Sequence, residues 1–208
     1  MDALPYSQAC ENNKRPILSV LQRHLDGVRS LLEIGAGTGQ HAEFLAGHFP
    51  GLRWQASDTA ASLPLLRPRV ARAGLPEPVA LDIDAAEWGC GSFDAIFSAN
   101  VLHIVGAPSV ENFFRGLGPH LNPDGLLLVY GPFRYRNAYT SESNAQFDRW
   151  LKQRDPVSGI RDFEWVDALA QEAGLSLVED NAMPANNQLL VFRMKSEGSN
   201  RAGQPADR

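Results

Sequence analysis

The residues best suited to hold a ligand are three glycines, Gly35, Gly37 and Gly39, which follow a short apolar run at 30–34. A glycine has no Cβ atom, so the backbone can turn sharply there and approach a bulky ligand closely. A helix expected from 40 to 47 directs its N-terminus at the same loop. The segment therefore predicts a strand that leads into a nucleotide-binding turn.

The spacing of these glycines separates two kinds of nucleotide loop. A dinucleotide-binding loop has the pattern Gly-x-Gly-x-x-Gly, whereas here the pattern is Gly-x-Gly-x-Gly, with Gln40 in the place of the third glycine. An acidic residue, Glu33, stands two places before the first glycine. This pattern resembles motif I of the class I S-adenosylmethionine-dependent methyltransferases. The alternative is a strand-turn-helix junction that uses glycine for its geometry alone.

Asp58 follows the second expected strand, 19 residues after the last glycine of the loop. A carboxylate at about this spacing, roughly 20 residues, can accept hydrogen bonds from both hydroxyls of a ribose. The alternative is a helix cap, because Ser57, Asp58 and Thr59 are all residue types that cap helices well.

Asp82 follows the third expected strand and can accept a hydrogen bond from an adenine amino group, with Ile83 against the adenine ring. Asp84 is close enough to compete for this role. Glu33 to Gly39, Asp58, Asp82 and the run 93–100 occur in the order found in class I methyltransferases. The resemblance implies that S-adenosyl-L-methionine is the cofactor.

A narrower resemblance covers nearly the whole chain. The segment 6–17 is similar to the opening of the DUF938 group, the methyltransferase-like 26 proteins, and six further segments agree with that group: 39–42, 98–104, 130–133, 140–144, 159–162 and 183–187. The resemblance strengthens the expected fold and cofactor and leaves the acceptor open. Several of these segments are polar and are expected in loops, where binding and catalytic residues concentrate.

Asn100 and His103 follow the fourth expected strand, at the rim where the methionine part of the cofactor and the acceptor should meet. An unperturbed imidazole titrates near neutral pH, so His103 is a candidate general base. The alternative is a histidine that is hydrogen-bonded within an apolar turn. The other candidate catalytic residues are Asn100 and Tyr130. Asn100 is also a candidate for binding the cofactor.

Aromatic side chains surround the end of the fifth expected strand and form a candidate acceptor wall that attracts the cationic sulfonium. The alternative is packing beneath a lid. Lys14 is a candidate partner of the cofactor carboxylate if the N-terminal helix covers the site, and a solvated helix face is the alternative. The candidate substrate-binding residues are Tyr6, Asn13, Phe133, Tyr135, Asn144 and Asn186.

These residues need a scaffold in which strands and helices alternate. Apolar runs predict seven strands, at 30–34, 52–56, 78–81, 93–98, 126–130, 176–179 and 189–193. Alternation with helices predicts an α/β fold of the Rossmann-like class I methyltransferase type, with a mostly parallel sheet covered on both faces. The last two strands have no helix between them, which predicts one antiparallel strand.

The chain has 208 residues, of which 44% are hydrophobic and 21% charged, and this composition is typical of one globular domain. We expect that domain at 1–195, with a helix at 11–25 as a possible lid and a substrate-side insertion at 131–162. The segment 196–208 lacks large apolar residues and is expected to be a disordered tail.

A net charge of −5 argues against nucleic acid and acidic membrane surfaces as partners. We expect a small-molecule substrate and a monomer or homodimer. The N-terminus has neither the basic start nor the apolar run of a secretory signal, so a cytoplasmic location is expected. Cys10 and Cys90 have no neighbours at metal-ligand spacing, so no metal site is expected.

The leading hypothesis is methyl transfer from S-adenosylmethionine to an oxygen, nitrogen or sulfur atom of a small molecule. A second hypothesis is an enzyme that uses the same cofactor for displacement at another sulfonium carbon. A third is a binding protein that holds the nucleotide without turnover, and a fourth is a nicotinamide oxidoreductase. The missing dinucleotide pattern counts against the fourth.

Overall fold

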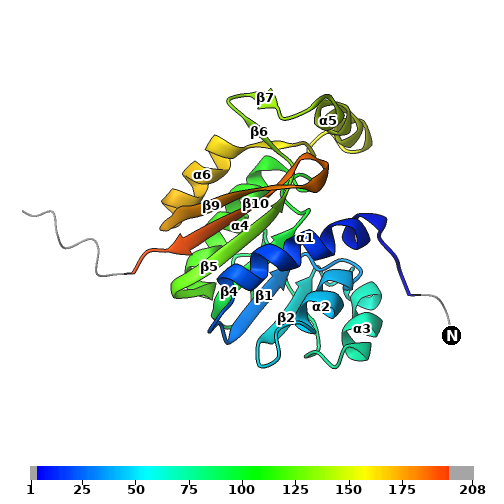
Figure 1. Cartoon of the computed structure of the whole chain (residues 1–208), viewed down its shortest axis with the longest axis vertical. Coiled ribbons are helices and arrows are strands. Elements are labelled where there is room, and N and C mark those ends of the chain that lie inside the picture. The colour runs from blue at the N-terminus through cyan, green and yellow to red at the C-terminus, as the bar shows by residue number, and fades with distance from the viewer. Residues whose placement is uncertain (1–3, 197–208) are drawn as a thin grey trace, which may run out of the picture.

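A computed structural model describes residues 4–196 of the chain, which form a seven-stranded sheet flanked by helices (Figure 1). The strand order is β3-β2-β1-β4-β5-β10-β9. The strands are β1 (Ser30–Ile34), β2 (Arg53–Asp58), β3 (Val79–Ala80), β4 (Phe93–Ala99), β5 (Leu121–Gly131), β9 (Leu175–Met183) and β10 (Asn187–Met194). The helices that flank the sheet are α1 (Gln8–His24), α2 (Gln40–Ala46), α3 (Leu63–Arg72), α4 (Ala107–Leu117) and α6 (Phe163–Glu172).

The sheet is parallel except at one strand. β1 pairs in parallel with β2 and β4, and β4 pairs in parallel with β5. β10 runs antiparallel to both of its neighbours, β5 and β9. The predicted seven-stranded sheet with one antiparallel strand is therefore confirmed.

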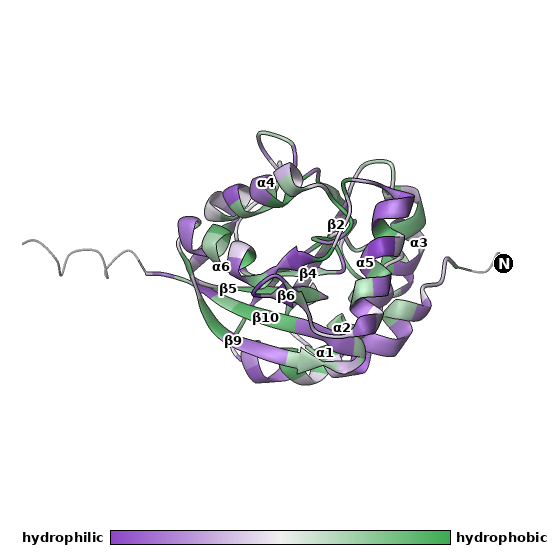
Figure 2. Ribbon diagram, turned by 90° about the horizontal axis from the view of Figure 1, so that it is seen from above, coloured by the Kyte–Doolittle hydropathy of each residue, from purple (hydrophilic) through white to green (hydrophobic). Residues whose placement is uncertain are grey.

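Alternating side chains on the strands divide the core into two halves. Leu31 on β1 belongs to a cluster that includes buried residues of α1, α2 and α3. Leu32, the next residue, belongs to a second cluster with buried residues of α4 and α6. Figure 2 shows α1 on one side of the sheet and α4 and α6 on the other. Burial on both faces explains why the central strands are continuous apolar runs.

The segment between β5 and α6 forms a small unit of its own at the carboxyl end of the sheet (Figure 1). Its elements are β6 (Phe133–Tyr135), β7 (Ala138–Tyr139), α5 (Glu142–Arg154) and β8 (Arg161–Asp162), with the strand order β7-β6-β8. Asp148 on α5 is buried and accepts hydrogen bonds from the Tyr139 hydroxyl (2.6 Å), the Lys152 ammonium (2.6 Å) and the Ile160 amide (2.7 Å). This carboxylate ties α5 to the strands on both sides of it.

Several element boundaries differ from the sequence prediction. α1 begins at Gln8 rather than residue 11, because Ser7 caps it by accepting a hydrogen bond from the Cys10 amide. β3 has only two residues, which places Asp82 in a turn beyond the strand rather than at its end. β5 begins at Leu121 rather than residue 126, and the additional residues cause an irregularity in its pairing with β4. Two 3-10 turns, η1 (Gly118–His120) and η2 (Pro184–Asn186), complete the fold.

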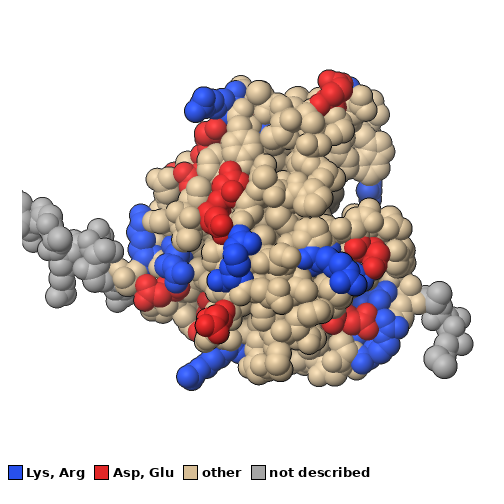
Figure 3. Space-filling view, in the orientation of Figure 1, with Lys and Arg blue, Asp and Glu red and all other residues tan. Residues whose placement is uncertain are grey.

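Within the described residues, every helix is too short or too polar to cross a membrane. Positive and negative side chains are interspersed on the face shown in Figure 3. The tail expected at 196–208 lies outside the described residues from 197 onward.

Candidate functional site

The glycine loop connects β1 to α2 with a left-handed backbone at all three glycines, where φ is +74°, +56° and +76° at Gly35, Gly37 and Gly39. The Gly35 amide donates a hydrogen bond to the Ser57 carbonyl at 3.1 Å, which holds the loop against β2. A Cβ atom at Gly35 would lie 2.4 Å from a methyl of Val101. Glycine is therefore required there both by the backbone conformation and by the close approach of the loop after β4.

A first cavity, of about 310 Å³, lies beside this loop at the carboxyl ends of β1, β2 and β4. Five of the predicted cofactor residues line it together with apolar side chains: Gly35, Asp58, Asp82, Ile83 and Asn100. Its lining residues are Ile34, Gly35, Asp58, Thr59, Leu81, Asp82, Ile83, Asp84, Asn100, Val101, Ile104 and Val105. The carboxyl edge of an open α/β sheet is where such folds bind their ligands.

Asp58 holds the glycine loop and faces the first cavity. One carboxylate oxygen accepts a hydrogen bond from the Gly37 amide at 2.7 Å, and the other accepts one from the Thr59 amide at 2.7 Å. The N-cap of α3 is Ser62, so Asp58 is not the cap of that helix. The Thr59 hydroxyl is also within 3.5 Å of Oδ1, whereas Oδ2 retains a further lone pair that can accept from a ribose hydroxyl.

Asp82 and Asp84 both line the first cavity, but their carboxylates are engaged differently. Both oxygens of Asp84 accept hydrogen bonds from α4, from Ser109 at 2.7 Å and from Asn112 at 2.9 Å. Asp82 accepts one hydrogen bond, from the Asp84 amide to Oδ1. Within the described chain its Oδ2 has no partner, so Asp82 is the better placed of the two to bind a ligand.

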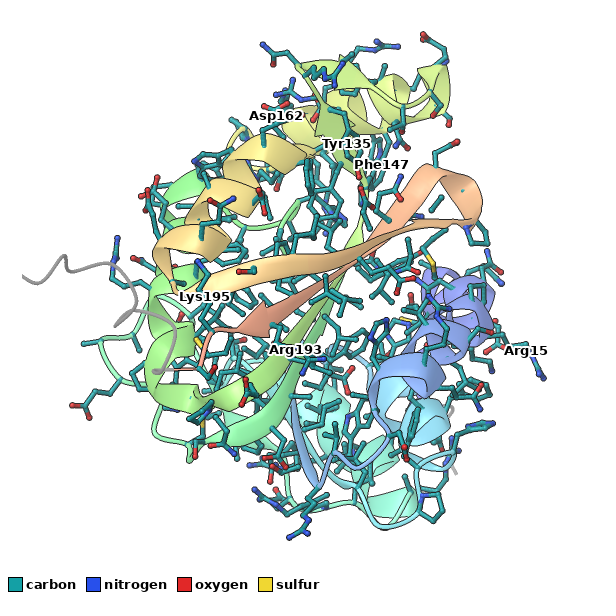
Figure 4. All side chains as sticks on the ribbon, turned by 60° about the vertical axis from the view of Figure 1, so that its left-hand side comes forward. Arg15, Tyr135, Phe147, Asp162, Arg193 and Lys195 are labelled. Carbon is teal, nitrogen blue, oxygen red and sulfur yellow. The ribbon has the colours of Figure 1, made fainter. Side chains whose placement is uncertain are left out.

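A second cavity, of about 370 Å³, lies between the start of α1, the end of β5, α5 and η2. It brings together four predicted residues, Asn13, Asn100, Tyr130 and Asn144. The full lining is Ala9, Asn12, Asn13, Asn100, Tyr130, Pro132, Ser143, Asn144, Phe147, Pro184, Ala185 and Asn187. Phe147 belongs to α5 and lies on the side of that helix near the turn that joins β9 to β10 (Figure 4).

Asn100 lines both cavities and so marks the place where they meet. Its backbone is left-handed, with φ of 61°, and its amide donates a hydrogen bond to the Tyr130 carbonyl at 2.8 Å. Asparagine tolerates this conformation better than other side chains do. Its carboxamide makes no hydrogen bond with residues 4–196, so both of its polar atoms are available to ligands.

Tyr130 is almost fully buried at the wall of the second cavity. Burial raises the pKa of its hydroxyl, while hydrogen bonds from Asn13 and Asn187 oppose the rise. Asn13 is held in turn by the buried His41, whose Nε2 lies 2.6 Å from the Asn13 Oδ1. Burial lowers the pKa of His41 to about 4, with the nearby Lys14 charge adding to the effect, so the neutral ring donates its Nε2 proton to Asn13 at neutral pH.

His103 lies behind the second cavity rather than in its lining. Its side chain is 5% exposed and its ring packs edge-on against Phe147. Burial lowers its pKa to about 4, and the Arg161 charge acts in the same direction. The imidazole is therefore neutral at pH 7 and weakly basic, and its role as a general base stays a prediction that this placement does not favour.

Glu33 is not part of either cavity. Its carboxyl group is 1% exposed and accepts a hydrogen bond from the Trp54 indole at 2.7 Å. Burial raises its pKa to about 7; the Trp54 bond lowers it and the Asp58 charge raises it further. Glu33 thus lies beneath the glycine loop, in contact with β2, and the predicted direct contact with the cofactor finds no support in this position.

Several predicted substrate or cofactor residues lie elsewhere for identifiable reasons. Lys14 pairs with Glu11 and lies over the Phe44 ring. Its neighbour Arg15 is exposed at the edge of the molecule (Figure 4), with its guanidinium 5.9 Å from the centre of the same ring. Phe133 is 1% exposed, because its side of β6 packs into the core. Three others are directed away from the second cavity by their own contacts.

The three predicted residues that their own contacts direct away from the second cavity are Tyr6, Tyr135 and Asn186. Tyr6 is 62% exposed and its hydroxyl bonds to Gln8. The Tyr135 hydroxyl donates to Asp180 at 2.7 Å, which together with burial raises its pKa. The Asn186 carbonyl accepts from the Asn144 side chain at 2.9 Å, and its own amide donates to a serine of α5. Its neighbours on either side line the cavity in its place.

Sequence reasoning missed several lining residues. Asn187 is adjacent to the predicted Asn186, and nothing in the sequence distinguishes the two. Pro132 and Pro184 lie in the family-like segments at 130–133 and 183–187, which were the available signal. Phe147 carries no sequence signal, because its role depends on where α5 docks. Among residues 4–196, no group of three or more His, Cys, Asp or Glu side chains is arranged to hold a metal ion.

Comparison with known proteins places this architecture among the Rossmann-like methyltransferase folds. An O-methyltransferase family protein from Burkholderia thailandensis superposes with a TM-score of 0.79 at 17% identity, over 91% of this chain and 58% of that one. The S-adenosylmethionine-dependent methyltransferase SibL gives 0.75 at 24% identity, over 89% and 55%. Human N-acetylserotonin methyltransferase in complex with SAM gives 0.77 at 15% identity, over 91% and 53%.

The chain spans little more than half the length of these three proteins, and at such identities the likeness shows the fold. The family is shown by a different comparison. The model of the family described as "Protein of unknown function (DUF938)" matches residues 4–194. The chain therefore belongs to the DUF938 family.

Proposed function

We propose that this protein is an S-adenosylmethionine-dependent methyltransferase that acts on a small molecule. The observation that carries the proposal is the pair of cavities that meet at Asn100, one beside the glycine loop and one beside Tyr130. A transferase of this kind must hold a nucleoside donor and an acceptor in line and exclude water from the point of contact.

The composition of the first cavity suits this donor. Leu81, Ile83 and Val105 offer apolar contacts for an adenine ring, while Asp58 and Asp82 offer carboxylates for the ribose hydroxyls and the adenine amino group. Among the described residues, the lining of this cavity has carboxylates and no basic side chain. Carboxylates attract a sulfonium or ammonium cation and repel a pyrophosphate, which disfavours a nicotinamide dinucleotide.

When bound, S-adenosylmethionine would supply an electrophilic methyl group: a lone pair of the acceptor forms the new bond to the methyl carbon, and the carbon–sulfur bond breaks with both electrons remaining on sulfur. The chain's own residues then have three tasks. Asp58 fixes the glycine loop and orients the nucleoside, Asn100 bridges donor and acceptor, and Tyr130 holds the acceptor from the opposite wall. Alignment of this kind is the main contribution a protein can make to an in-line displacement.

We also propose the finer assignments that the sequence suggests. These are kinship with the methyltransferase-like 26 proteins, a cytoplasmic location, and action as a monomer or homodimer without nucleic acid or membrane partners. The other uses of this site are displacement at another sulfonium carbon and nucleotide binding without turnover. Both share the donor cavity, so they are separated from methyl transfer by analysis of products rather than by binding.

Calorimetric titration tests the donor assignment. We expect S-adenosylhomocysteine and S-adenosylmethionine to bind at one site and NADH not to bind. Asp58→Asn should weaken binding about tenfold, which corresponds to about 1.4 kcal/mol, because a charge-assisted hydrogen bond to the ribose is lost. Asp26→Asn, a change in the loop after α1 at the opposite end of the sheet, is the control. Absence of binding by either sulfur nucleotide would contradict the proposal.

A further inference from the structure

The second cavity differs from the first in its charge. Its twelve lining residues include none of the ionisable types Asp, Glu, Lys, Arg and His among the described residues, whereas three aspartates line the first cavity. Five of the twelve are asparagines, at positions 12, 13, 100, 144 and 187. The polar groups offered to a ligand there are therefore carboxamides and hydroxyls.

A charged ligand group would lose its hydration in this cavity without meeting an opposite charge. Such an unpaired charge is costly to bury, whereas neutral polar groups are accommodated when they are hydrogen-bonded. The remaining lining residues, including Pro132, Phe147 and Pro184, are apolar and suit a flat hydrocarbon surface.

Hydrogen-bonding capacity remains free within the described chain at several of the carboxamides, including those of Asn100 and Asn144. The amide nitrogen of Asn144 is used by Thr140 and the Asn186 carbonyl, both at 2.9 Å, and its Oδ1 has no partner in the described chain. The Asn100 carboxamide is unpartnered within residues 4–196, as described above. A ligand with a neutral donor and a neutral acceptor can therefore be satisfied on both sides.

Tyr130 lines the second cavity together with Asn13 and Asn187, whose side chains oppose the rise that burial causes in its pKa. Asn13 is held by the buried His41, whose Nε2 lies 2.6 Å from the Asn13 Oδ1. Within residues 4–196 no protein group takes the proton of the Tyr130 hydroxyl, so this proton is available to a ligand in the cavity.

On the basis of the proposed function, we propose that the second cavity selects an uncharged acceptor molecule that takes a hydrogen bond from the Tyr130 hydroxyl. His41 is a positioning residue in this scheme, because it touches Asn13 and not the ligand. The uncharged lining and the contact by which His41 holds Asn13 in the same lining as Tyr130 are the two features that determine the selection.

Three probes of matched size test the charge selection: 4-hydroxybenzamide (neutral), 4-hydroxybenzoate (anionic) and 4-hydroxybenzylamine (cationic). Their affinities are measured by NMR titration at pH 7, with and without S-adenosylhomocysteine. We expect the neutral probe to bind at least tenfold more tightly than either ion. Equal or tighter binding of an ion, or no binding of the neutral probe at millimolar concentration, overturns the proposal.

Variants test the roles of Tyr130 and His41. Tyr130→Phe and His41→Ala should each weaken the neutral probe severalfold and leave the affinity for S-adenosylhomocysteine unchanged. His41→Gln should restore probe binding, because a glutamine amide can donate to the Asn13 oxygen. Unchanged probe affinity in Tyr130→Phe contradicts the inference. Failure of S-adenosylhomocysteine to bind contradicts the proposed function instead. In that case the relative affinities of the three probes, measured without S-adenosylhomocysteine, still test whether the second cavity selects an uncharged molecule.

Discussion

At the scale of single residues, two neighbouring carboxylates in one cavity have different partners. Asp84 is fully engaged by Ser109 and Asn112 on α4, whereas Asp82 retains an oxygen without a partner in the described chain. Sequence position alone made both residues candidates for the adenine amino group. The hydrogen bonds, which depend on where α4 packs, assign the ligand contact to Asp82 and a structural role to Asp84.

Substitution of each aspartate in turn tests this division. Asp82→Asn should weaken S-adenosylhomocysteine about tenfold, because an amide is a poorer acceptor than a carboxylate. Asp84→Asn should change affinity little and lower stability by about 1 kcal/mol, since its bonds to α4 lose their charged partner. Calorimetry and thermal unfolding measure the two effects. The reverse pattern, with Asp84 controlling affinity, would show that the assignment is wrong.

At the scale of elements, a short strap at 158–161 fixes the loop that forms one side of the first cavity. Four consecutive carbonyls of that loop, 102–105, accept hydrogen bonds from the strap. The Arg161 guanidinium donates to the carbonyls of Leu102 and Val105. The Gly159 amide donates to the His103 carbonyl at 3.0 Å, and the Ser158 hydroxyl donates to the Ile104 carbonyl at 2.6 Å. The same strap is joined to α5 through Asp148. The insertion therefore supports both cavities.

Removal of the Arg161 guanidinium should disturb this loop. In Arg161→Met three carbonyls lose this donor, two of them in the loop 102–105 and the third at Val157. We therefore expect S-adenosylhomocysteine affinity to fall about threefold to tenfold and amide exchange at 101–105 to accelerate. Arg149→Met is the matched control, since Arg149 is exposed on α5 and its one partner within residues 4–196 is Glu142. Affinity and exchange rates equal to those of the control would contradict the supporting role.

The sequence predicted the elements better than it predicted the contacts between them. Apolar runs and glycine spacing gave the sheet, its antiparallel strand and the loop at Gly35 to Gly39, because these depend on local chemistry. The contacts of His41 with Asn13 and of Arg161 with the loop 102–105 join positions 28 or more residues apart. Phe133 was misplaced for the same reason, since a three-residue strand gives no reliable indication of which face is buried.

At the scale of the whole molecule, three buried ionisable groups make stability depend on pH. Burial lowers the pKa values of His41 and His103 to about 4 and raises that of Glu33 to about 7. Between pH 4.5 and 6.5 the unfolded chain binds protons at both histidines that the folded chain does not bind. Over the same range the folded chain binds one proton at Glu33 that the unfolded chain lacks.

The two histidines outweigh the one glutamate, so the free energy of unfolding should fall as the pH is lowered from 6.5 to 4.5. The net loss is about 2 kcal/mol, from about 1.4 kcal/mol for each pH unit and proton, because each group titrates only partly at the ends of this range. In His41→Gln only His103 and Glu33 remain, and their effects on the free energy of unfolding have opposite signs. Most of the pH dependence of stability between pH 4.5 and 6.5 should therefore disappear. Chemical denaturation at a series of pH values measures it. Stability that is constant or increases toward pH 4.5 in the unsubstituted protein would contradict the account.

The central claim is that the two cavities form one site that is divided at Asn100. Its most direct test is a crystal structure of the protein with S-adenosylhomocysteine. We predict the ribose at Asp58, the adenine between Asp82 and Val105, and the sulfur beside Asn100, facing the cavity at Tyr130. A nucleotide bound elsewhere, or one whose sulfur is directed away from the second cavity, would contradict the claim.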